Sequence, residues 1–593
     1  MNIANSLRAY YVFCGGGFVP LPDTHGYTEY KEENTSYDQH FGLDPTVDEN
    51  DWHIDFSHFG NTFAVIPSFD TALPPLRIDL RIPDQTVWPS ELWSILGARD
   101  SVHMHGPRIN SLGIAHHLRR ALTHWSRHNP DFEQQYRSLS FGSRIMTPQI
   151  LADPNQITFK FKPEYGNRLV EQLLSVSALE KIWEGIPNIT MPPIVPWTKL
   201  QYRKQLASQV ALVSLNTESG TEDWVFKSRT SGPASLYHEL KVLFTQPHSK
   251  HTVDSPTYLV TTFSPEHNED RVCGFLMKYY NLGTLATTLP MRRRDGTLTF
   301  KKQLQWAKDV TSALLHVTSN SAKFYSDLRM DNLVLDDQVD RPETAVLIDF
   351  EQGRNVYNWA PPEIYYLEWV AELGCETWAN QTPGLDQDTK DRFSRLLERY
   401  LAVIGHEGPL LSEPDIYDNA PLGWYFPWVL SSQEERNAGE VYLLGKALWC
   451  IFEGRGDADI ILGRGNVEDG EQRFPEFRLT PEPLRKLIAD CTAGAREWKD
   501  GPLGIYRRGG QVFPLGKTGL NGEPEGTFEE TKAAITNFWQ KEMDKAECFL
   551  EARMKYYQGK ASETDMEWLD YLRRPSLTDV LQTLQSIVGE QKL

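Results

Sequence analysis

Two short apolar runs in the middle of the chain predict a buried β-hairpin. Leu333–Leu335 and Ala345–Ile348 are each bounded by polar, turn-forming residues. Apolar runs of this length between turn formers are typical of buried strands. Asp327 and Asn332 precede the first run, and Asp349 directly follows the second. The pattern therefore places three polar side chains beside a hydrophobic hairpin.

Other segments have the spacing of helices. Phe300–Asn320 repeats apolar residues every three or four positions, and residues 440–454 are apolar on nearly all sides, as expected for a buried helix. Ser111–His128 and Arg168–Ile186 are predicted to be helices in the N-terminal part. The former contains His124 and His128 one turn apart, a spacing that could hold a metal but is more often a pair of surface histidines.

Three strands of an antiparallel sheet are predicted between these regions. Leu200–Leu206, Val210–Leu215 and Trp224–Lys227 have strand-like composition and are separated by short turns. The preceding Met191–Pro196 is rich in proline and predicts a stiff linker.

Size and composition limit the functional class. A chain of 593 residues exceeds what one core accommodates, so two or three domains are expected. The net charge of −20 argues against nucleic-acid binding and against an anionic membrane surface, since both require surplus Lys and Arg. Six widely spaced cysteines form neither a disulfide framework nor a zinc site. These features predict a soluble intracellular protein, cytoplasmic or nuclear, with no membrane partner.

The polar residues around the hairpin resemble the motifs of protein kinases. Ser326–Asn332 reads SDLRMDN, similar to the catalytic loop D-L-x-x-x-N. Ile348–Glu351 reads IDFE, similar to D-F-G, and Ala360–Glu363 reads APPE, similar to A-P-E. With IDFEQGR and the segment Leu422–Trp428, the chain resembles a divergent fungal group of protein-kinase-like proteins.

The resemblance implies an α+β, bilobal protein-kinase-like fold. A small antiparallel β lobe over about residues 191–285 would precede a mainly helical large lobe over about 286–593. The large lobe would contain inserts at about 370–425 and 496–570. Residues 1–190 lie outside the resemblance and are predicted to form an N-terminal accessory α+β region.

The resemblance also implies an ATP site. Lys227 would contact the α- and β-phosphates and pair with Glu239 from a following helix. The residues that would surround the adenine are Val225, Met277, Lys278, Tyr280 and Val334.

The resemblance also implies roles in phosphoryl transfer for particular residues. Asp327 would orient or deprotonate the acceptor hydroxyl, and Arg329 would steady the γ-phosphate. Asn332 and Asp349 would hold Mg²⁺. The resemblance implies a protein substrate phosphorylated on Ser or Thr, with all these groups meeting around one cleft between two lobes. Glu363 is expected to pair with Arg574 as a structural ion pair, with Arg496 as the alternative.

Three departures from the family leave other functions open. The turn Ala207–Gln209 has no glycine where the family has a glycine-rich lid, and Glu351 replaces the glycine of D-F-G. Ser326 replaces the arginine that binds an activation-loop phosphate, and Tyr357 is the only hydroxyl-bearing residue between Asp349 and Glu363, so activity is predicted to be independent of loop phosphorylation. A pseudokinase that serves as a binding scaffold is the main alternative, and a small-molecule kinase with a similar I-D-F-E motif is the second.

Overall fold

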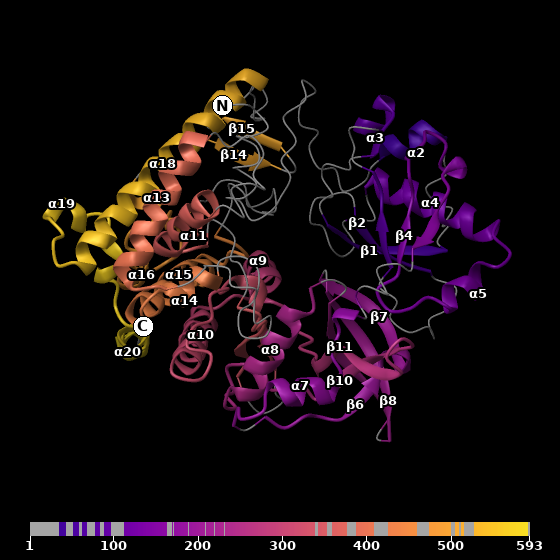
Figure 1. The fold of residues 1–593 in the computed structure, drawn as a ribbon, viewed down its shortest axis with the longest axis horizontal. Helices are drawn as coiled ribbons and strands as arrows, with labels where there is room; N and C mark the ends of the chain where they lie inside the picture. Colours follow the sequence, from indigo (N-terminus) through magenta and orange to yellow (C-terminus); the bar gives the residue numbers. More distant parts are fainter. Residues whose placement is uncertain are drawn as a thin grey trace. The chain divides into compact units, whose positions relative to one another are not determined.

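The fold is mixed α+β and divides into two units (Figure 1). The structure is a computed structural model that describes residues 35–42, 51–58, 62–67, 78–83, 88–96, 109, 112–162, 169, 171–187, 189–207, 209–218, 220–229, 232–337, 342–352, 359–375, 387–407, 425–458, 474–499, 505–508, 511–514 and 527–590. The N-terminal unit comprises Thr28–Phe244 and Asp254–Tyr279. The described residues of the C-terminal unit lie within Thr245–Val253 and Tyr280–Glu590. The structure thus has two units, and the predicted division into three domains remains a prediction.

The first part of the N-terminal unit is a five-stranded sheet with helices. In order, its strands are β1 (Trp52–His58), β2 (Thr62–Pro67), β3 (Ile78–Arg81), β4 (Arg144–Met146) and β5 (Lys160–Lys162), antiparallel except for β3 and β4. The associated helices are α2 (Thr35–Phe41), α3 (Trp93–Leu96), α4 (Gly113–Arg127) and α5 (Phe132–Arg137), with short 3₁₀ turns η2 (Ser90–Leu92) and η5 (Pro154–Gln156). The predicted helix at residues 111–128 is confirmed as α4. Its His124 and His128 rings stack with centroids 4.0 Å apart, and His128 Nδ1 donates to the His124 carbonyl.

The second part of the N-terminal unit is a six-stranded sheet in the order β6-β10-β11-β9-β8-β7. The strands are β6 (Ile194–Pro196), β7 (Leu200–Ala207), β8 (Val210–Thr217), β9 (Gly220–Ser228), β10 (Tyr258–Ser264) and β11 (Glu269–Lys278), with η6 (Trp197–Lys199) before β7. The three predicted strands are confirmed as β7, β8 and β9. The predicted proline linker is wrong, because Ile194–Pro196 pairs with β10 as a parallel edge strand. Proline is tolerated there because an edge strand leaves one side of its backbone unpaired.

The predicted continuous helix over Arg168–Ile186 is also wrong. The chain leaves the helical conformation at Leu173 and Leu174, and α7 (Val176–Ile182) begins only after Ser175. The Ser175 hydroxyl accepts a hydrogen bond from Ala178 N and caps α7, a position for which serine is strongly preferred. The backbone at Ser175 forms a bridge with Arg271 of β11, so a distant strand interrupts the helix.

The C-terminal unit is mainly helical. Its helices are α9 (Leu285–Arg294), α10 (Phe300–Thr318), α11 (Pro362–Gly374), α13 (Gln387–Ile404), α14 (Tyr425–Leu430), α15 (Gln433–Glu453), α16 (Glu482–Cys491), α17 (Arg496–Lys499), α18 (Phe528–Tyr557), α19 (Glu563–Met566) and α20 (Leu577–Glu590). Two antiparallel hairpins, β12 (Leu333–Asp336) with β13 (Thr344–Leu347) and β14 (Ile505–Arg508) with β15 (Gln511–Pro514), and the 3₁₀ turns η7 (Met330–Asn332) and η9 (Asp570–Arg573) complete it. The predicted hairpin is confirmed as β12–β13, and the predicted helices are confirmed as α10 and as α15, which is buried from Gly439 to Glu453.

The two predicted inserts contribute α13 and α18, which pack with each other and with α11 (Figure 1). Arg392 and Arg399 of α13 form ion pairs with Glu547 and Glu551 of α18. Residues 376–386 and 408–424 of the first insert, with Leu422, lie outside the described residues.

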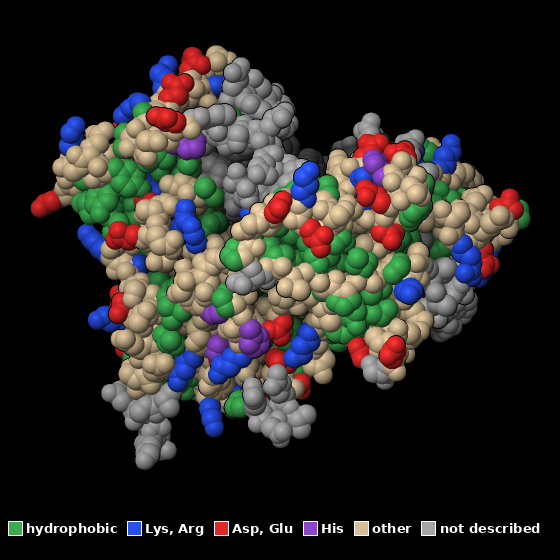
Figure 2. All heavy atoms as spheres, turned by 60° about the horizontal axis from the view of Figure 1, so that its bottom comes forward, with side chains coloured by type: hydrophobic (Ala, Val, Ile, Leu, Met, Phe, Trp, Pro, Cys, Tyr) green, Lys and Arg blue, Asp and Glu red, His purple; other side chains and the backbone are tan. Residues whose placement is uncertain are grey.

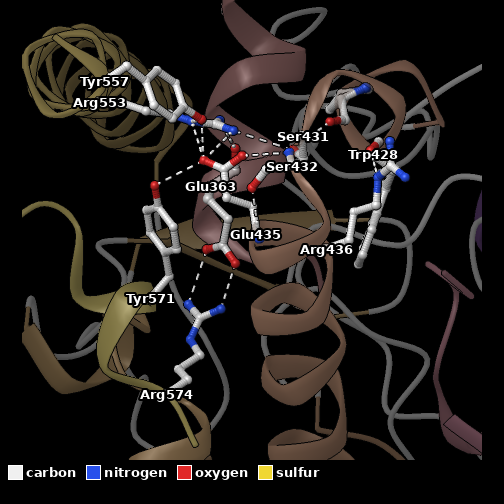
Figure 3. Close-up of polar contacts among 11 residues, drawn as sticks. Glu363, Trp428, Ser431, Ser432, Glu435, Arg436, Arg553, Tyr557, Tyr571 and Arg574 are labelled. Carbon is white, nitrogen blue, oxygen red and sulfur yellow. Dashed lines mark hydrogen bonds and ion pairs between the residues drawn. The ribbon is translucent and has the colours of Figure 1, made fainter. Parts of the chain in front are cut away.

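A buried cluster of charges ties α18 and the C-terminal segment to α15 (Figure 3). Glu435, in the first turn of α15, accepts hydrogen bonds from Arg553 of α18 and from the hydroxyls of Tyr557 and Tyr571. Although burial opposes it, the Arg553 guanidinium holds the pKa of Glu435 below its usual value. Arg553 also bonds to the Glu363 carbonyl, so the second insert is fixed directly to the core of this unit.

The predicted Glu363–Arg574 ion pair is confirmed in the same cluster (Figure 3). Arg574 Nη1 and Nη2 lie 2.5 and 3.1 Å from the two Glu363 oxygens, a bidentate geometry. The alternative partner, Arg496, pairs with Glu542 of α18 instead.

The face in Figure 2 carries hydrophobic patches as well as charges of both signs. Figure 2 shows Lys and Arg interspersed with Asp and Glu across the face in view. Of the described helices, none is both long and apolar enough to cross a bilayer.

Candidate active site

Lys227 and Glu239 form the first half of the candidate site, within the N-terminal unit. Lys227 lies near the end of β9, and Glu239 lies on α8 (Ala234–Thr245). Lys227 Nζ is 2.6 Å from Glu239 Oε2, and the two side chains are only 6% and 1% exposed. The predicted ion pair is therefore confirmed. Because desolvation offsets most of the attraction in a buried pair, stability alone is a weak reason to bury one, and a functional role is favoured.

The predicted adenine residues of this unit lie on β9, which carries Lys227, and on the neighbouring β11. Val225 pairs with Met277, and the neighbouring Lys278 pairs with Trp224 across β9 and β11. Because side chains alternate along a strand, Val225 and Lys227 share one face of β9. Met277 is buried, Val225 is half-buried and Lys278 is exposed.

Gly274 lets β11 approach Lys227 closely. A Cβ at this position would lie 2.4 Å from the Lys227 carbonyl oxygen and 2.5 Å from the Phe226 ring. No real side chain fits at such distances, so the position of Lys227 depends on a glycine in the facing strand.

Asp327 and Asn332 form the second half of the candidate site, within the C-terminal unit. Asn332 Nδ2 donates to the Asp327 carbonyl oxygen at 2.8 Å and to its carboxylate at 3.1 Å. Arg329 Nε lies 3.6 Å from the same carboxylate. The backbone N–H of Ile348 donates to the Asn332 carbonyl at 3.0 Å, so the hairpin register brings Asp349 to the same end of the two strands as Asn332.

The electrostatics of this half suit proton transfer and metal binding. Burial raises the pKa of Asp327 to about 7, and the negative charges of Asp349 and Glu351 act in the same direction against the Arg329 guanidinium. A carboxyl group that titrates near neutral pH is suited to general-base chemistry. Asn332 and Asp349 offer hard oxygen ligands of the kind that Mg²⁺ prefers, and a bound divalent cation would offset the accumulated negative charge.

The backbone at this half is held in uncommon conformations. Ser326 and Asp349 have φ values of +71° and +66°, which non-glycine residues rarely adopt. Such conformations cost about 1–3 kcal/mol and persist where surrounding contacts fix them. Tyr325 supplies one such contact, because its hydroxyl donates to the Ile348 carbonyl next to Asp349.

Glu440 of α15 supplies the other contact and was missed as a site residue from the sequence. Its Oε1 accepts hydrogen bonds from the backbone N–H groups of Tyr325 (2.5 Å) and Ser326 (2.9 Å). Glu440 is fully buried, and burial raises its pKa to about 7 despite these two hydrogen bonds. The available signal was a carboxylate inside a helix that is otherwise apolar on nearly all sides.

Of the remaining predicted residues of this unit, Val334 lies on β12 and Tyr280 lies in the turn before Thr284. Val334 is buried and forms a bridge with Thr284, and Leu335 N donates to the Gly283 carbonyl. Tyr280 begins the turn that leads to this bridge, since its carbonyl accepts from Gly283 N. Ser208 of the glycine-free turn and Tyr357 lie outside the described residues.

Each unit therefore brings its own predicted residues together: Lys227, Glu239, Val225, Met277 and Lys278 in one, and Asp327, Arg329, Asn332, Asp349, Val334 and Tyr280 in the other. Comparison with protein-family models gives no match, and comparison with curated proteins gives none either. The functional interpretation therefore depends on the chemistry of these residues.

Proposed function

We propose that this chain is an ATP- and Mg²⁺-dependent phosphotransferase of the protein-kinase type, transferring the γ-phosphate to a Ser or Thr hydroxyl of a protein. The observation that carries the proposal is the arrangement of Asp327, Asn332 and Asp349 at one end of the β12–β13 hairpin. The buried Lys227–Glu239 pair supports it independently, because it combines a phosphate-binding cation with the carboxylate that would orient it.

A bilobal kinase-like fold is part of the proposal. The six-stranded, mostly antiparallel sheet with α8 would serve as the small lobe, and the helices from α9 onward would serve as the large lobe. The five-stranded sheet would be an accessory region attached to the small lobe.

The residues of this chain would divide the reaction between them. Lys227, oriented by Glu239, would bind the α- and β-phosphates. Asn332 and Asp349 would hold Mg²⁺, which neutralises phosphate charge when it is bound. The Asp327 carboxylate would accept the proton of the attacking hydroxyl, and Arg329 would counter charge on the transferred phosphate. Arginine keeps the positive charge of the lysine usual at this position and presents it as a planar fork.

A binding module that lacks catalysis is the second candidate, and Glu351 favours it. Its negative charge adds to those of Asp327 and Asp349, which opposes the approach of a polyphosphate unless a cation is bound. A small-molecule kinase is less well supported. Glu363, the last residue of the APPE sequence, forms a bidentate pair with Arg574, and this pair fits the protein-kinase pattern.

Thermal unfolding with and without ATP and Mg²⁺ tests the proposal. A ligand at about one hundred times its Kd stabilises the folded state by about 2.7 kcal/mol. The proposal expects a shift that requires both ATP and Mg²⁺ and is lost in Asp349→Asn. A shift without phosphate transfer would support the binding module, and no shift at any ATP concentration would overturn the nucleotide site itself.

A further inference from the structure

The segment 171–183 of the N-terminal region binds directly to α8, the helix that carries Glu239. The hydroxyl of Tyr237, on α8, accepts a hydrogen bond from Leu174 N and donates one to the Val272 carbonyl of β11, both at 2.8 Å. Val272 N in turn donates to the Leu174 carbonyl at 2.8 Å. One buried hydroxyl therefore joins the segment, α8 and β11.

The segment pairs with the part of β11 that β9 does not reach. β9 pairs with β11 between Gly274 and Lys278, and the bridge between Ser175 and Arg271 lies on the part of β11 before Gly274. Arg271 strengthens this contact, because its Nη1 donates to the carbonyls of Leu173 (2.8 Å) and Glu171 (3.3 Å). The interruption of the predicted helix at Leu173–Ser175 is what makes these carbonyls available.

A second contact lies at the other end of α8. The Trp183 ring, just after α7, packs edge-on against Phe244 with centroids 6.0 Å apart, and both rings are buried. Tyr237 and Phe244 are seven positions apart, close to two helical turns, so the segment contacts one side of α8 along its length. Glu239 is two positions from Tyr237 and therefore lies about 200° around the helix, where it meets Lys227.

We propose that residues 171–183 are an internal latch that holds α8 in place and thereby keeps Glu239 paired with Lys227. Tyr237 is the positioning residue that the latch engages. The predicted consequence for ATP binding rests on the proposed function, whereas the restraint on α8 does not. The inference gives part of the N-terminal region a role that its sequence did not indicate.

Hydrogen exchange of the α8 amides in the full-length chain tests the restraint. Tyr237→Phe keeps the ring and removes both hydrogen bonds of the hydroxyl. The latch predicts that exchange across residues 236–245 becomes about tenfold faster, equivalent to about 1.4 kcal/mol of lost local stability. Tyr136→Phe, at a buried tyrosine on α5, should leave α8 exchange unchanged. Unaltered α8 exchange in a folded Tyr237→Phe protein would overturn the latch.

A double-mutant cycle tests the consequence for the site. Tyr237→Phe should weaken ATP binding about tenfold in the natural sequence and have no further effect in a Glu239→Gln background. Equal losses in both backgrounds would indicate a general structural effect and contradict the positioning role. If the natural protein does not bind ATP, the proposed function fails while the exchange experiment still decides the latch. Arg271→Met, which removes the guanidinium that donates to the Leu173 and Glu171 carbonyls, is a second variant with the same expected direction if Tyr237→Phe does not fold.

Discussion

Lys227 and Glu239 form an ion pair with a 2.6 Å contact in which both side chains are nearly inaccessible to solvent. Removing one partner leaves the other charge buried, which typically costs about 3–5 kcal/mol, whereas replacing both with apolar residues is often neutral. Comparing the single replacement with the double replacement therefore separates a structural role for this pair from a functional one.

The first prediction concerns this pair. Lys227→Met should lower the free energy of unfolding by about 3–5 kcal/mol, and the double variant Lys227→Met/Glu239→Leu should recover most of that loss. The double variant should nevertheless show no thermal shift with ATP and Mg²⁺. Lys204→Met, at an exposed lysine of the same sheet, is the matched control and should match the natural protein in both measurements. An ATP response that survives in the stable double variant would remove Lys227 from the site.

The second prediction compares two adjacent arginines. Arg574 and its partner Glu363 are each 1% exposed, whereas the Arg573 side chain is 69% exposed and pairs with Asp570. Arg574→Met should therefore destabilise the protein by about 3–5 kcal/mol in denaturant unfolding. Arg573→Met should change the free energy of unfolding by less than about 1 kcal/mol. Similar effects at the two positions would contradict the structural role of the Glu363–Arg574 pair.

The third prediction concerns the attachment of α18. Arg553→Met removes the guanidinium that faces Glu435 and leaves that carboxylate buried among the hydroxyls of Tyr557 and Tyr571 (Figure 3). Amide exchange in the C-terminal half of α18 should become at least tenfold faster, with a loss of about 3–5 kcal/mol in stability. Lys555→Met is the control, because Lys555 lies two positions along α18 from Arg553 and has an exposed side chain. Equal exchange in the two variants would show that the Glu435 cluster does not hold the helix.

The fourth prediction is a pH dependence of stability that arises from Glu440. Burial raises its folded-state pKa to about 7 from an ordinary value of 4.5, so the neutral form is favoured in the folded protein. A raised pKa contributes stability that is fully present below the unfolded pKa and is lost as the pH rises through the folded one. Glu440→Gln removes this titration and keeps an oxygen that can accept from Tyr325 N and Ser326 N.

The stability of the natural protein is therefore compared with that of Glu440→Gln over the pH range in which Glu440 titrates. Between pH 5 and pH 8 the natural protein should lose roughly 2–3 kcal/mol relative to Glu440→Gln, measured by denaturant unfolding at each pH. Parallel pH profiles would mean that Glu440 does not titrate in this range.

The sequence predicted the elements whose signals are local. The two apolar runs before Asp349 predicted the β12–β13 hairpin, and the strand ending at Lys227 and the helix carrying Glu239 followed from composition and order. The Glu363–Arg574 contact spans 211 positions and could be predicted only because both residues lie in motifs with a known relationship.

Contacts without such a motif could not be predicted. Glu440 contacts Tyr325 across 115 positions, and although a carboxylate inside an apolar helix signals a buried polar contact, nothing in the sequence identifies Tyr325 as its partner. Ile194–Pro196 becomes a strand because β10 lies beside it, and proline composition alone favoured a linker. Leu174 leaves the helical pattern because Val272 and Tyr237 offer it hydrogen bonds, a tertiary effect that overrides local propensity.

Transfer of labelled γ-phosphate from ATP to a basic model protein in the presence of Mg²⁺ is the most direct test of the proposed activity. The natural chain should label the acceptor, and Asp327→Asn should lower the rate about 10²–10⁴-fold with little change in ATP affinity, because general-base assistance is lost. Asp331→Asn removes the same charge from an exposed neighbour of Asn332 and should retain the rate within about threefold. Equal transfer by Asp327→Asn and the natural chain, or no transfer by a natural chain that binds ATP, would contradict the assignment of Asp327 as the base.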